Sequence, residues 1–332
     1  MKKIYITDYF YNAIIEKKIF GRTAKVLCIG KKNKKSYLKQ IQDADGLLVW
    51  HADINYNLIK SLKKCKAIVR YGVGYDNIDI NAAKENNIVC MNTPDYGIDE
   101  VADTAVAMIL ALLRKIFHYN INSKKYKNFW QENVLQENLH NPIKRSSELS
   151  VGIIGFGRIG SAISSRLKPF GFKIGFYDPY LSSGYDKVFG VKKFTNLNDL
   201  VKSCDVISIN SHLNKDTNSL VDKKFISKMK KNSILINTAR GKIVRKLDDL
   251  YYGLKKGILG GVGLDVMPEE PPNQNEKLIK SWKNIKDPIN KKIIINPHGG
   301  YYSTRSVIEM REKASQNLKN AIFKNIFLNK IN

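Results

Sequence analysis

The sequence predicts an α/β protein of two domains, each an open parallel sheet with helices on both faces. Short apolar runs alternate with helical patterns along the chain, which is typical of parallel strands joined by crossover helices. Residues 150–178 contain a strand, a glycine-rich turn, a helix and a second strand, in that order. A length of 332 residues is enough for two hydrophobic cores.

Residues 1–98 are predicted to form a small open sheet. Asp8 interrupts the first apolar run early, so this run predicts a strand and not a signal peptide. A helix is predicted over residues 57–63. The strands are predicted over residues 3–7, 25–29, 46–49, 67–71 and 88–91.

A long helix is predicted to begin at Asp99 and Glu100, because acidic side chains stabilise a helix N-terminus. Residues 119–149 are polar, and we expect them to be irregular, with Phe129 and Trp130 as anchors. This segment is either an arm over a partner subunit or an excursion on the surface.

The most informative motif is the G-x-G-x-x-G turn of residues 155–160, which directly follows an apolar strand over residues 151–154. Gly155 makes the tight turn, Gly157 lets the backbone approach a pyrophosphate, and Gly160 lets the helix pack on the strand. The motif therefore predicts a dinucleotide site, and the alternative is a plain strand–helix turn.

The rest of this βαβ unit supports the dinucleotide. Arg158 and Ile159 lie at the helix N-terminus, where amide donors and partial positive charge favour phosphates. Asp178 ends the second strand, 18 residues after Gly160, where a carboxylate would accept hydrogen bonds from the adenosine ribose. A 2′-phosphate would meet a like charge there, so NAD is predicted over NADP.

The net charge of +26 raises the question of an acidic partner, such as nucleic acid or a membrane surface. Most of the excess is lysine, and basic runs such as residues 31–35 lack the interleaved aromatic side chains that stack on bases. We therefore predict a solvated lysine surface, with no specific nucleic-acid partner and no membrane association.

The four cysteines are scattered and form no C-x-x-C pair, which predicts free thiols in a reducing cytoplasm. No set of cysteines and histidines has zinc-ligand spacing, so no metal site is predicted.

Three polar segments follow apolar strands in the second half of the chain, and they carry an arginine, a glutamate and a histidine. The carboxyl ends of parallel strands are where open α/β sheets bind ligands. The segments are residues 237–241, 264–272 and 296–300. The strands are predicted over residues 206–210, 234–237, 260–266 and 293–296, with a final helix over residues 304–327.

These segments give the sequence a resemblance to the D-isomer-specific 2-hydroxyacid dehydrogenases. The resemblance extends from about residue 46 to residue 325 and includes VRYGVGYDNID at 69–79, FYDPY at 176–180 and PHGGYYS at 297–303. The triplet Glu309-Met310-Arg311 is similar to the branch that contains the C-terminal-binding-protein corepressors. Tyr301 departs from that branch, whose members have a tryptophan there.

The family resemblance implies a domain organisation. Residues 1–98, completed by residues 303–332, would be a flavodoxin-like substrate-binding domain. Residues 99–302 would be a Rossmann NAD-binding domain. The active site would lie in the cleft between them, and the NAD domain would form a homodimer.

The resemblance also implies the catalytic roles. His298 would be the acid/base, since imidazole exchanges protons near neutral pH. Glu270, rather than its neighbour Glu269, would pair with His298. Arg240 would grip the substrate carboxylate as a bidentate donor.

The resemblance also implies residues that bind the substrate and the cofactor. The backbone amides of Val73 and Gly74 would hold the other side of the carboxylate. His51 is left open between a substrate contact and a structural role, and His118, His140 and His212 are not expected to be ligands. The residues assigned to the cofactor are Thr104, Gly155, Gly157, Arg158, Ile159, Gly160, Asp178, Thr238 and Asp265.

Two functions fit these observations. The first is NAD-dependent interconversion of a 2-keto acid and a D-2-hydroxy acid. The second is an NAD-sensing binding protein that resembles the corepressors. The sequence does not identify the side chain of the substrate.

Overall fold

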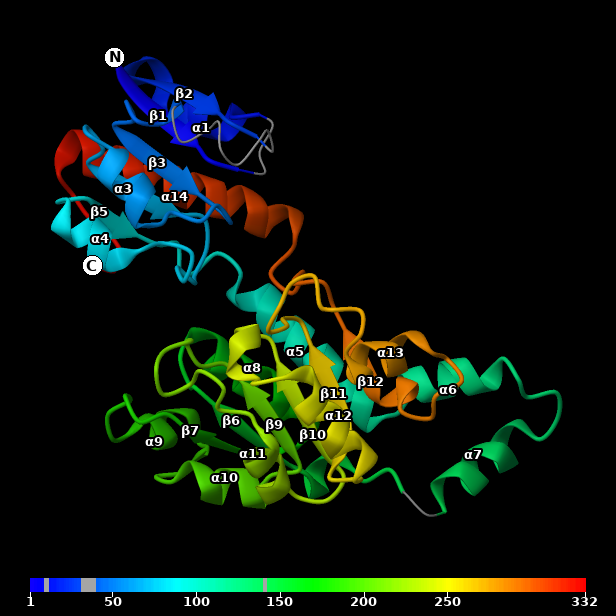
Figure 1. Ribbon diagram of the computed structural model, residues 1–332. Helices are drawn as coiled ribbons and strands as arrows, with labels where there is room; N and C mark the ends of the chain where they lie inside the picture. The colour runs from blue at the N-terminus through cyan, green and yellow to red at the C-terminus, as the bar shows by residue number, and fades with distance from the viewer. Residues whose placement is uncertain (9–11, 31–39, 140–141) are drawn as a thin grey trace. The chain divides into compact units, whose positions relative to one another are not determined.

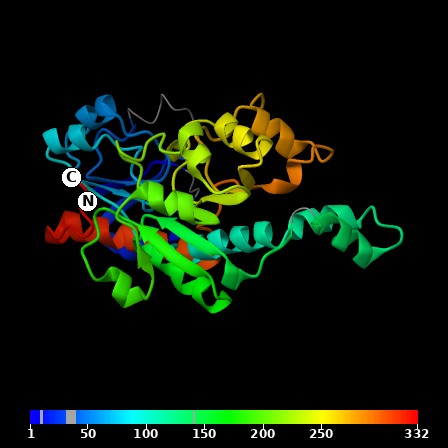
Figure 2. The same cartoon turned by 90° about the horizontal axis from the view of Figure 1, so that it is seen from below.

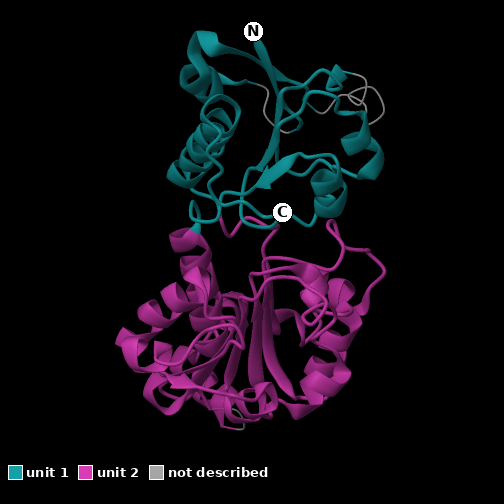
Figure 3. Cartoon of the chain, turned by 90° about the vertical axis from the view of Figure 1, so that its left-hand side faces the viewer, with its two compact units in different colours: residues 1–97, 302–332 teal, residues 98–301 magenta. Residues whose placement is uncertain are grey.

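Two parallel sheets organise the chain, and each belongs to its own compact unit. The computed structural model describes residues 1–8, 12–30, 40–139 and 142–332 (Figures 1 and 2). Unit 1 comprises residues 1–97 and 302–332, and unit 2 comprises residues 98–301 (Figure 3). Each observed boundary lies one residue from the predicted one.

Unit 1 contains a five-stranded sheet in the order β2-β1-β3-β4-β5, with every pairing parallel. This is the flavodoxin-like order. The strands are β1 (Lys2–Ile6), β2 (Ala24–Cys28), β3 (Gly46–Val49), β4 (Ala67–Arg70) and β5 (Val89–Met91).

Helices cover both faces of this sheet. The helices are α1 (Ile14–Phe20), α3 (Tyr56–Ser61), α4 (Ile80–Glu85) and α14 (Thr304–Lys324). Apolar residues of α1 and α14 pack on one face, and those of α3 and α4 pack on the other. Asn55, Asp79 and Ser303 cap α3, α4 and α14 with their side chains, which explains where these helices begin.

Unit 2 contains a seven-stranded parallel sheet in the order β12-β11-β10-β9-β6-β7-β8. Numbered within the unit, six strands follow the Rossmann order 3-2-1-4-5-6, and the seventh strand extends one edge. The strands are β6 (Ser150–Ile154), β7 (Lys173–Tyr177), β8 (Lys192–Lys193), β9 (Val206–Ile209), β10 (Ser233–Asn237), β11 (Leu259–Leu264) and β12 (Ile293–Ile295).

The second sheet is also covered on both faces, which confirms the predicted fold class. On one face lie α5 (Ile98–Leu113) and α8 (Arg158–Leu167). The other face is covered by α10 (Leu197–Ser203), α11 (Lys223–Lys228), α12 (Leu247–Lys255) and α13 (Lys277–Lys283). A short helix, α9 (Tyr185–Phe189), follows β7.

The prediction of an irregular segment over residues 119–149 is wrong. The chain forms α6 (Ile116–Ser123) and α7 (Trp130–Asn138), and α7 projects away from the sheet of unit 2 (Figures 1 and 2). Polar contacts between the two helices, rather than an apolar stripe, hold them together, so hydrophobic periodicity gave no signal. Phe129 and Trp130 do not anchor the segment, because they are 71% and 60% exposed.

Two features of the sequence lie outside the described residues, namely His140 and the basic run over residues 31–35. Of the helices in the described ranges, none has both the length and the apolar character needed to cross a membrane.

A buried ion pair joins the first and last helices of unit 1. The Arg311 guanidinium on α14 donates from Nε and Nη2 to the two carboxylate oxygens of Glu16 on α1, at 2.8 and 2.7 Å. The hydroxyl of Tyr71 donates to the same carboxylate at 2.8 Å. Glu16 is fully buried, so its charge depends on these donors.

We predict that Arg311→Met destabilises the protein by roughly 3–5 kcal/mol, because it leaves the Glu16 carboxylate buried without its cation. Arg305→Met is the matched control on the same helix. Arg305 is exposed and lies 3.7 Å from Glu309, so its loss should cost less than about 1 kcal/mol. Urea unfolding curves of the two variants measure the difference, and equal losses would contradict this account.

Candidate active site

The glycine-rich turn after β6 has the geometry that its sequence predicts. Gly155 has φ +85°, and a Cβ there would lie 2.7 Å from the backbone nitrogen of Ser211. A Cβ on Gly160 would lie 2.2 Å from the carbonyl oxygen of Gly155. At Gly157 a Cβ would meet nothing within 4 Å. The turn is therefore closed on its protein side and open where a phosphate would approach.

The N-terminus of α8 is available to that phosphate. Gly157 is the N-cap residue and supplies no side-chain cap, and Arg158 and Ile159 are the first two helical residues. The backbone amides in the first turn of a helix have no partners within the helix. An anion is the natural partner for these donors.

Asp178 is fixed beside the same turn. One carboxylate oxygen accepts a hydrogen bond from the backbone amide of Phe156 at 2.9 Å, and the other accepts from the amide of Tyr180 at 3.0 Å. These bonds place the carboxylate at the end of β7, next to the glycine-rich turn.

Three buried polar atoms lie where β9 and β10 end. The side-chain oxygens of Asn210, Ser211 and Thr238 have no hydrogen-bond partner among the residues described. Burying such atoms unpaired is unfavourable, so they indicate a place for a polar ligand. Of the three, only Thr238 was predicted, although Asn210 is the last residue of the predicted strand over residues 206–210 and Ser211 directly follows it.

The open turn, the uncapped helix and these unpaired oxygens fit a dinucleotide. The phosphates would lie at the first turn of α8, the adenosine ribose at Asp178, and the nicotinamide toward the ends of β9 and β10. A bound dinucleotide would supply the hydride in a reduction.

His298 and Glu270 are in direct contact. The imidazole Nδ1 lies 2.7 Å from Oε2 of Glu270, and Oε1 accepts a hydrogen bond from the amide of Met267 at 2.9 Å. The contact favours Glu270, rather than the neighbouring Glu269, as the partner of the ring. His298 has φ +52°, a left-handed conformation that is uncommon outside glycine and that often marks functional positions.

The environment favours the ionised form of Glu270. Burial alone raises its pKa, but the hydrogen bond and charge of His298, the Met267 amide and the charge of Arg240 together lower the pKa below its usual value. Glu270 is therefore a carboxylate near neutral pH and can stabilise a protonated imidazole.

Asp265 holds the loop that carries His298. Its Oδ1 accepts hydrogen bonds from the side chain of Asn296 at 2.7 Å and from the amides of Gly299 and Gly300 at 3.0 and 2.9 Å. Burial raises the pKa of Asp265. Thr104 on α5 holds the same loop, because its hydroxyl donates to the carbonyl of Gly300 at 3.2 Å. Both residues were predicted as cofactor contacts, and the contacts seen here are with the loop.

Arg240 lies at the end of β10, and its loop touches the loop of Glu270. A Cβ on Gly241 would lie 1.8 Å from the carbonyl oxygen of Met267, so only glycine permits this approach. The side chain of Arg240 donates to the carbonyl of Ala239 at 2.8 Å. Arg240, Glu270 and His298 thus follow three adjacent strands, β10, β11 and β12, at one edge of the sheet.

Val73 and Gly74 belong to unit 1, in the turn after β4. The carbonyl of Val73 accepts a hydrogen bond from the side chain of Asn92 at 2.7 Å, which fixes the turn. His51 stacks on Trp50 at 5.6 Å between ring centroids, and its amide donates to Asp8. The roles of Val73, Gly74 and His51 toward substrate stay predictions.

Comparison with known proteins identifies the family of the chain. Residues 106–300 match the family described as "D-isomer specific 2-hydroxyacid dehydrogenase, NAD binding domain". A glyoxylate reductase of Korarchaeum cryptofilum is 30% identical over 289 residues, which are 86% of this chain and 82% of that protein. A D-3-phosphoglycerate dehydrogenase of Methanocaldococcus jannaschii is 34% identical over 84% of this chain, which spans 51% of that longer protein.

Solved structures share the fold. A glyoxylate reductase from Paecilomyes thermophila superposes with a TM-score of 0.83 at 24% identity, over 99% of this chain and 98% of that one. A D-lactate dehydrogenase from Aquifex aeolicus, complexed with NAD and lactic acid, has a TM-score of 0.81 at 24% identity, over 99% and 100%. The chain belongs to the D-isomer specific 2-hydroxyacid dehydrogenases, which are NAD-dependent oxidoreductases.

Proposed function

We propose that this dehydrogenase interconverts a small 2-keto acid and its D-2-hydroxy acid through Arg240, Glu270 and His298. The observation that carries the proposal is the contact between His298 and Glu270, at 2.7 Å, beside the loop of Arg240. Reduction of a 2-keto acid requires a proton donor for the keto oxygen and a cation for the carboxylate. His298, held by Glu270, would be the donor, and the guanidinium of Arg240 at the same edge of the sheet would be the cation.

In the reductive direction, hydride adds to the carbonyl carbon and the C=O bond becomes a C–OH bond. His298 gives the proton that the carbonyl oxygen requires, and it takes that proton back in the oxidation. Glu270 stabilises the protonated imidazole and holds the ring. Arg240 binds the carboxylate and orients the keto group with its planar guanidinium.

The two units would bind different molecules. Residues 1–98 with 303–332 would bind substrate, with the amides of Val73 and Gly74 against its carboxylate. Residues 99–302 would bind NAD, through the first turn of α8, Asp178 and Thr238. Asp265 and Thr104 would position the His298 loop beside the nicotinamide.

Separate observations support proposals for the oligomeric state, the cellular location and the branch of the family. The exposed apolar residues of α7 favour a homodimer, which sedimentation would test, and the four free cysteines favour a cytoplasmic location. The triplet Glu309-Met310-Arg311 favours the corepressor-like branch, and Arg311 and Met310 are buried in unit 1. A binding protein without turnover is not favoured, because the similar proteins are named as reductases and dehydrogenases.

The first functional prediction concerns proton transfer. His298→Ala should lower the rate of hydride transfer by roughly 10²- to 10⁴-fold while NADH binding is retained, since a general acid is lost. Stopped-flow NADH oxidation measures the rate, with glyoxylate and 3-phosphohydroxypyruvate in the substrate panel because of the named relatives. Glu269→Gln is the control and should retain its rate. A fully active His298→Ala protein would remove this mechanism.

The second functional prediction concerns the pH dependence of keto-acid reduction. The folded protein lowers the pKa of Glu270 below that of an ordinary glutamate. Its carboxylate is therefore charged near neutral pH, and it takes up a proton only at a lower pH than an ordinary glutamate does. In Glu270→Gln that charge is missing, and the protonated imidazole is less stable. The alkaline limb of the keto-acid reduction profile should therefore move to lower pH by about one unit. An unmoved or raised limb would contradict the pairing.

The third functional prediction concerns the preference for NADH over NADPH. NADH should bind more tightly than NADPH, because a 2′-phosphate would lie beside the Asp178 carboxylate. Asp178→Ala removes the repulsion and two ribose acceptors, so the ratio of the two dissociation constants should approach one. Fluorescence titration of both coenzymes measures the ratio, and equal affinities in the unmodified protein would refute the assignment.

A further inference from the structure

A cavity of about 320 Å³ lies at the amino edge of the unit 2 sheet, the edge opposite to His298. Its wall includes Leu149 before β6, Asp205 before β9, Asn232 before β10 and Lys292 before β12. Residues of α6 and α7 complete it. The volume is near the lower end of the roughly 300–1,000 Å³ typical of small-molecule sites. Nothing in the proposed reaction uses this cavity.

The cavity carries more positive than negative charge. Two carboxylates, those of Glu137 and Asp205, line it. The five lysines that line it are Lys115, Lys144, Lys231, Lys291 and Lys292.

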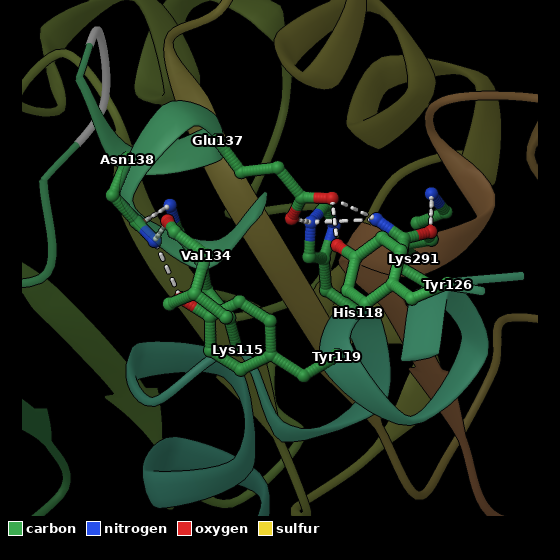
Figure 4. A network of polar contacts seen from close by, with 9 residues as sticks. Lys115, His118, Tyr119, Tyr126, Val134, Glu137, Asn138 and Lys291 are labelled. Atoms are coloured by element: carbon green, nitrogen blue, oxygen red, sulfur yellow. Dashed lines mark hydrogen bonds and ion pairs between the residues drawn. The ribbon is translucent and has the colours of Figure 1, made fainter. Parts of the chain in front are cut away.

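Both carboxylates are already engaged. Glu137 accepts hydrogen bonds from the side chains of His118, Asn122 and Tyr126, and the network extends to Lys291 (Figure 4). Burial alone raises the pKa of Glu137, but these hydrogen bonds outweigh it and lower the pKa.

Asp205 accepts from the amide and hydroxyl of Ser150 at 2.9 and 2.8 Å, and from Lys230 at 3.1 Å. Lys230 does not line the cavity. In the part of the chain that the structure describes, no carboxylate forms an ion pair with Lys144, Lys231 or Lys292. Three ammonium groups therefore remain for a ligand.

Burial is the main influence on the pKa values of two partly buried lysines of the wall. Burial lowers the pKa of Lys115, the charge of Glu137 opposes that shift, and the charge of Lys292 adds to it. Burial and the charge of Lys125 lower the pKa of Lys291. A bound anion would stabilise the charged form of both ammonium groups.

Part of the wall is apolar. Leu112 and Leu113 at the end of α5, together with Ile143, Leu149 and Ile234, line the cavity. An inorganic ion would leave these side chains without contact, whereas a ligand with a ring or a short hydrocarbon part would cover them. We propose that this cavity binds a small organic dianion, with a phosphate or paired carboxylates against the lysines and an apolar part against the leucine wall.

Phenyl phosphate is a probe of this chemistry, and direct binding to the full chain tests the proposal without relying on activity. The protein is first saturated with NADH, so that the coenzyme phosphate site is filled. Binding is then measured by calorimetric titration in 150 mM salt, because the salt screens weak attraction between the ligand and exposed surface charges. We expect saturable binding of phenyl phosphate, and no binding of phenol, which lacks the charge. Absence of saturable binding up to about 10 mM would overturn the proposal.

Two double variants locate the binding. Lys231→Gln with Lys292→Gln removes two cavity charges, and we expect at least about tenfold weaker binding of phenyl phosphate. Lys202→Gln with Lys224→Gln removes two exposed charges of unit 2 outside the cavity and should leave the affinity unchanged. Equal losses in both would show general charge attraction and would overturn the site.

A third variant covers the case in which the Lys292 substitution disturbs folding, as judged by thermal unfolding. Lys144 and Lys231 are exposed at the rim, so Lys144→Gln with Lys231→Gln should fold normally. Its affinity for phenyl phosphate should also fall, and an unchanged affinity would refute the assignment.

Discussion

The parallel direction of the strands is the constraint on which the chemistry of this protein depends. In a parallel sheet every strand ends at the same edge, so polar residues far apart in the sequence are brought together without a dedicated contact. Arg240, Glu270 and His298 follow β10, β11 and β12 in turn. The same constraint gathers the lysines that precede the strands at the opposite edge. One sheet thus presents two chemically different ends.

The loops at the carboxyl edge need additional support, because a strand fixes only where a loop begins. Asp265 supplies much of it by accepting three hydrogen bonds from the Asn296–Gly300 loop on one oxygen. Thr104 adds a bond from α5. With the loop held on both sides, His298 keeps its left-handed backbone and its contact with Glu270. We infer that Asp265 is a positioning residue, whose effect on turnover would pass through His298.

Much of the fold was predictable because hydrophobic patterns encode buried parallel strands directly. The strand over residues 46–49 was predicted with its observed ends, and the other long strands differ by one or two residues. β8 has two residues, too few for a pattern. α6 and α7 were missed because polar networks such as that of Glu137 stabilise them, and such networks leave no periodic signal. Asn210 and Ser211 were missed because their importance lies in unpaired burial, which only a structure shows.

We infer that the carboxyl edge of the unit 2 sheet directs stereospecific hydride transfer to a 2-keto acid. The most direct measurement is chiral chromatography of the product formed from a prochiral 2-keto acid, such as pyruvate, with NADH as the reductant. We predict that NADH oxidation is matched one for one by a hydroxy acid of D configuration. Formation of the L enantiomer, or no NADH oxidation with any 2-keto acid in a broad panel, would contradict it.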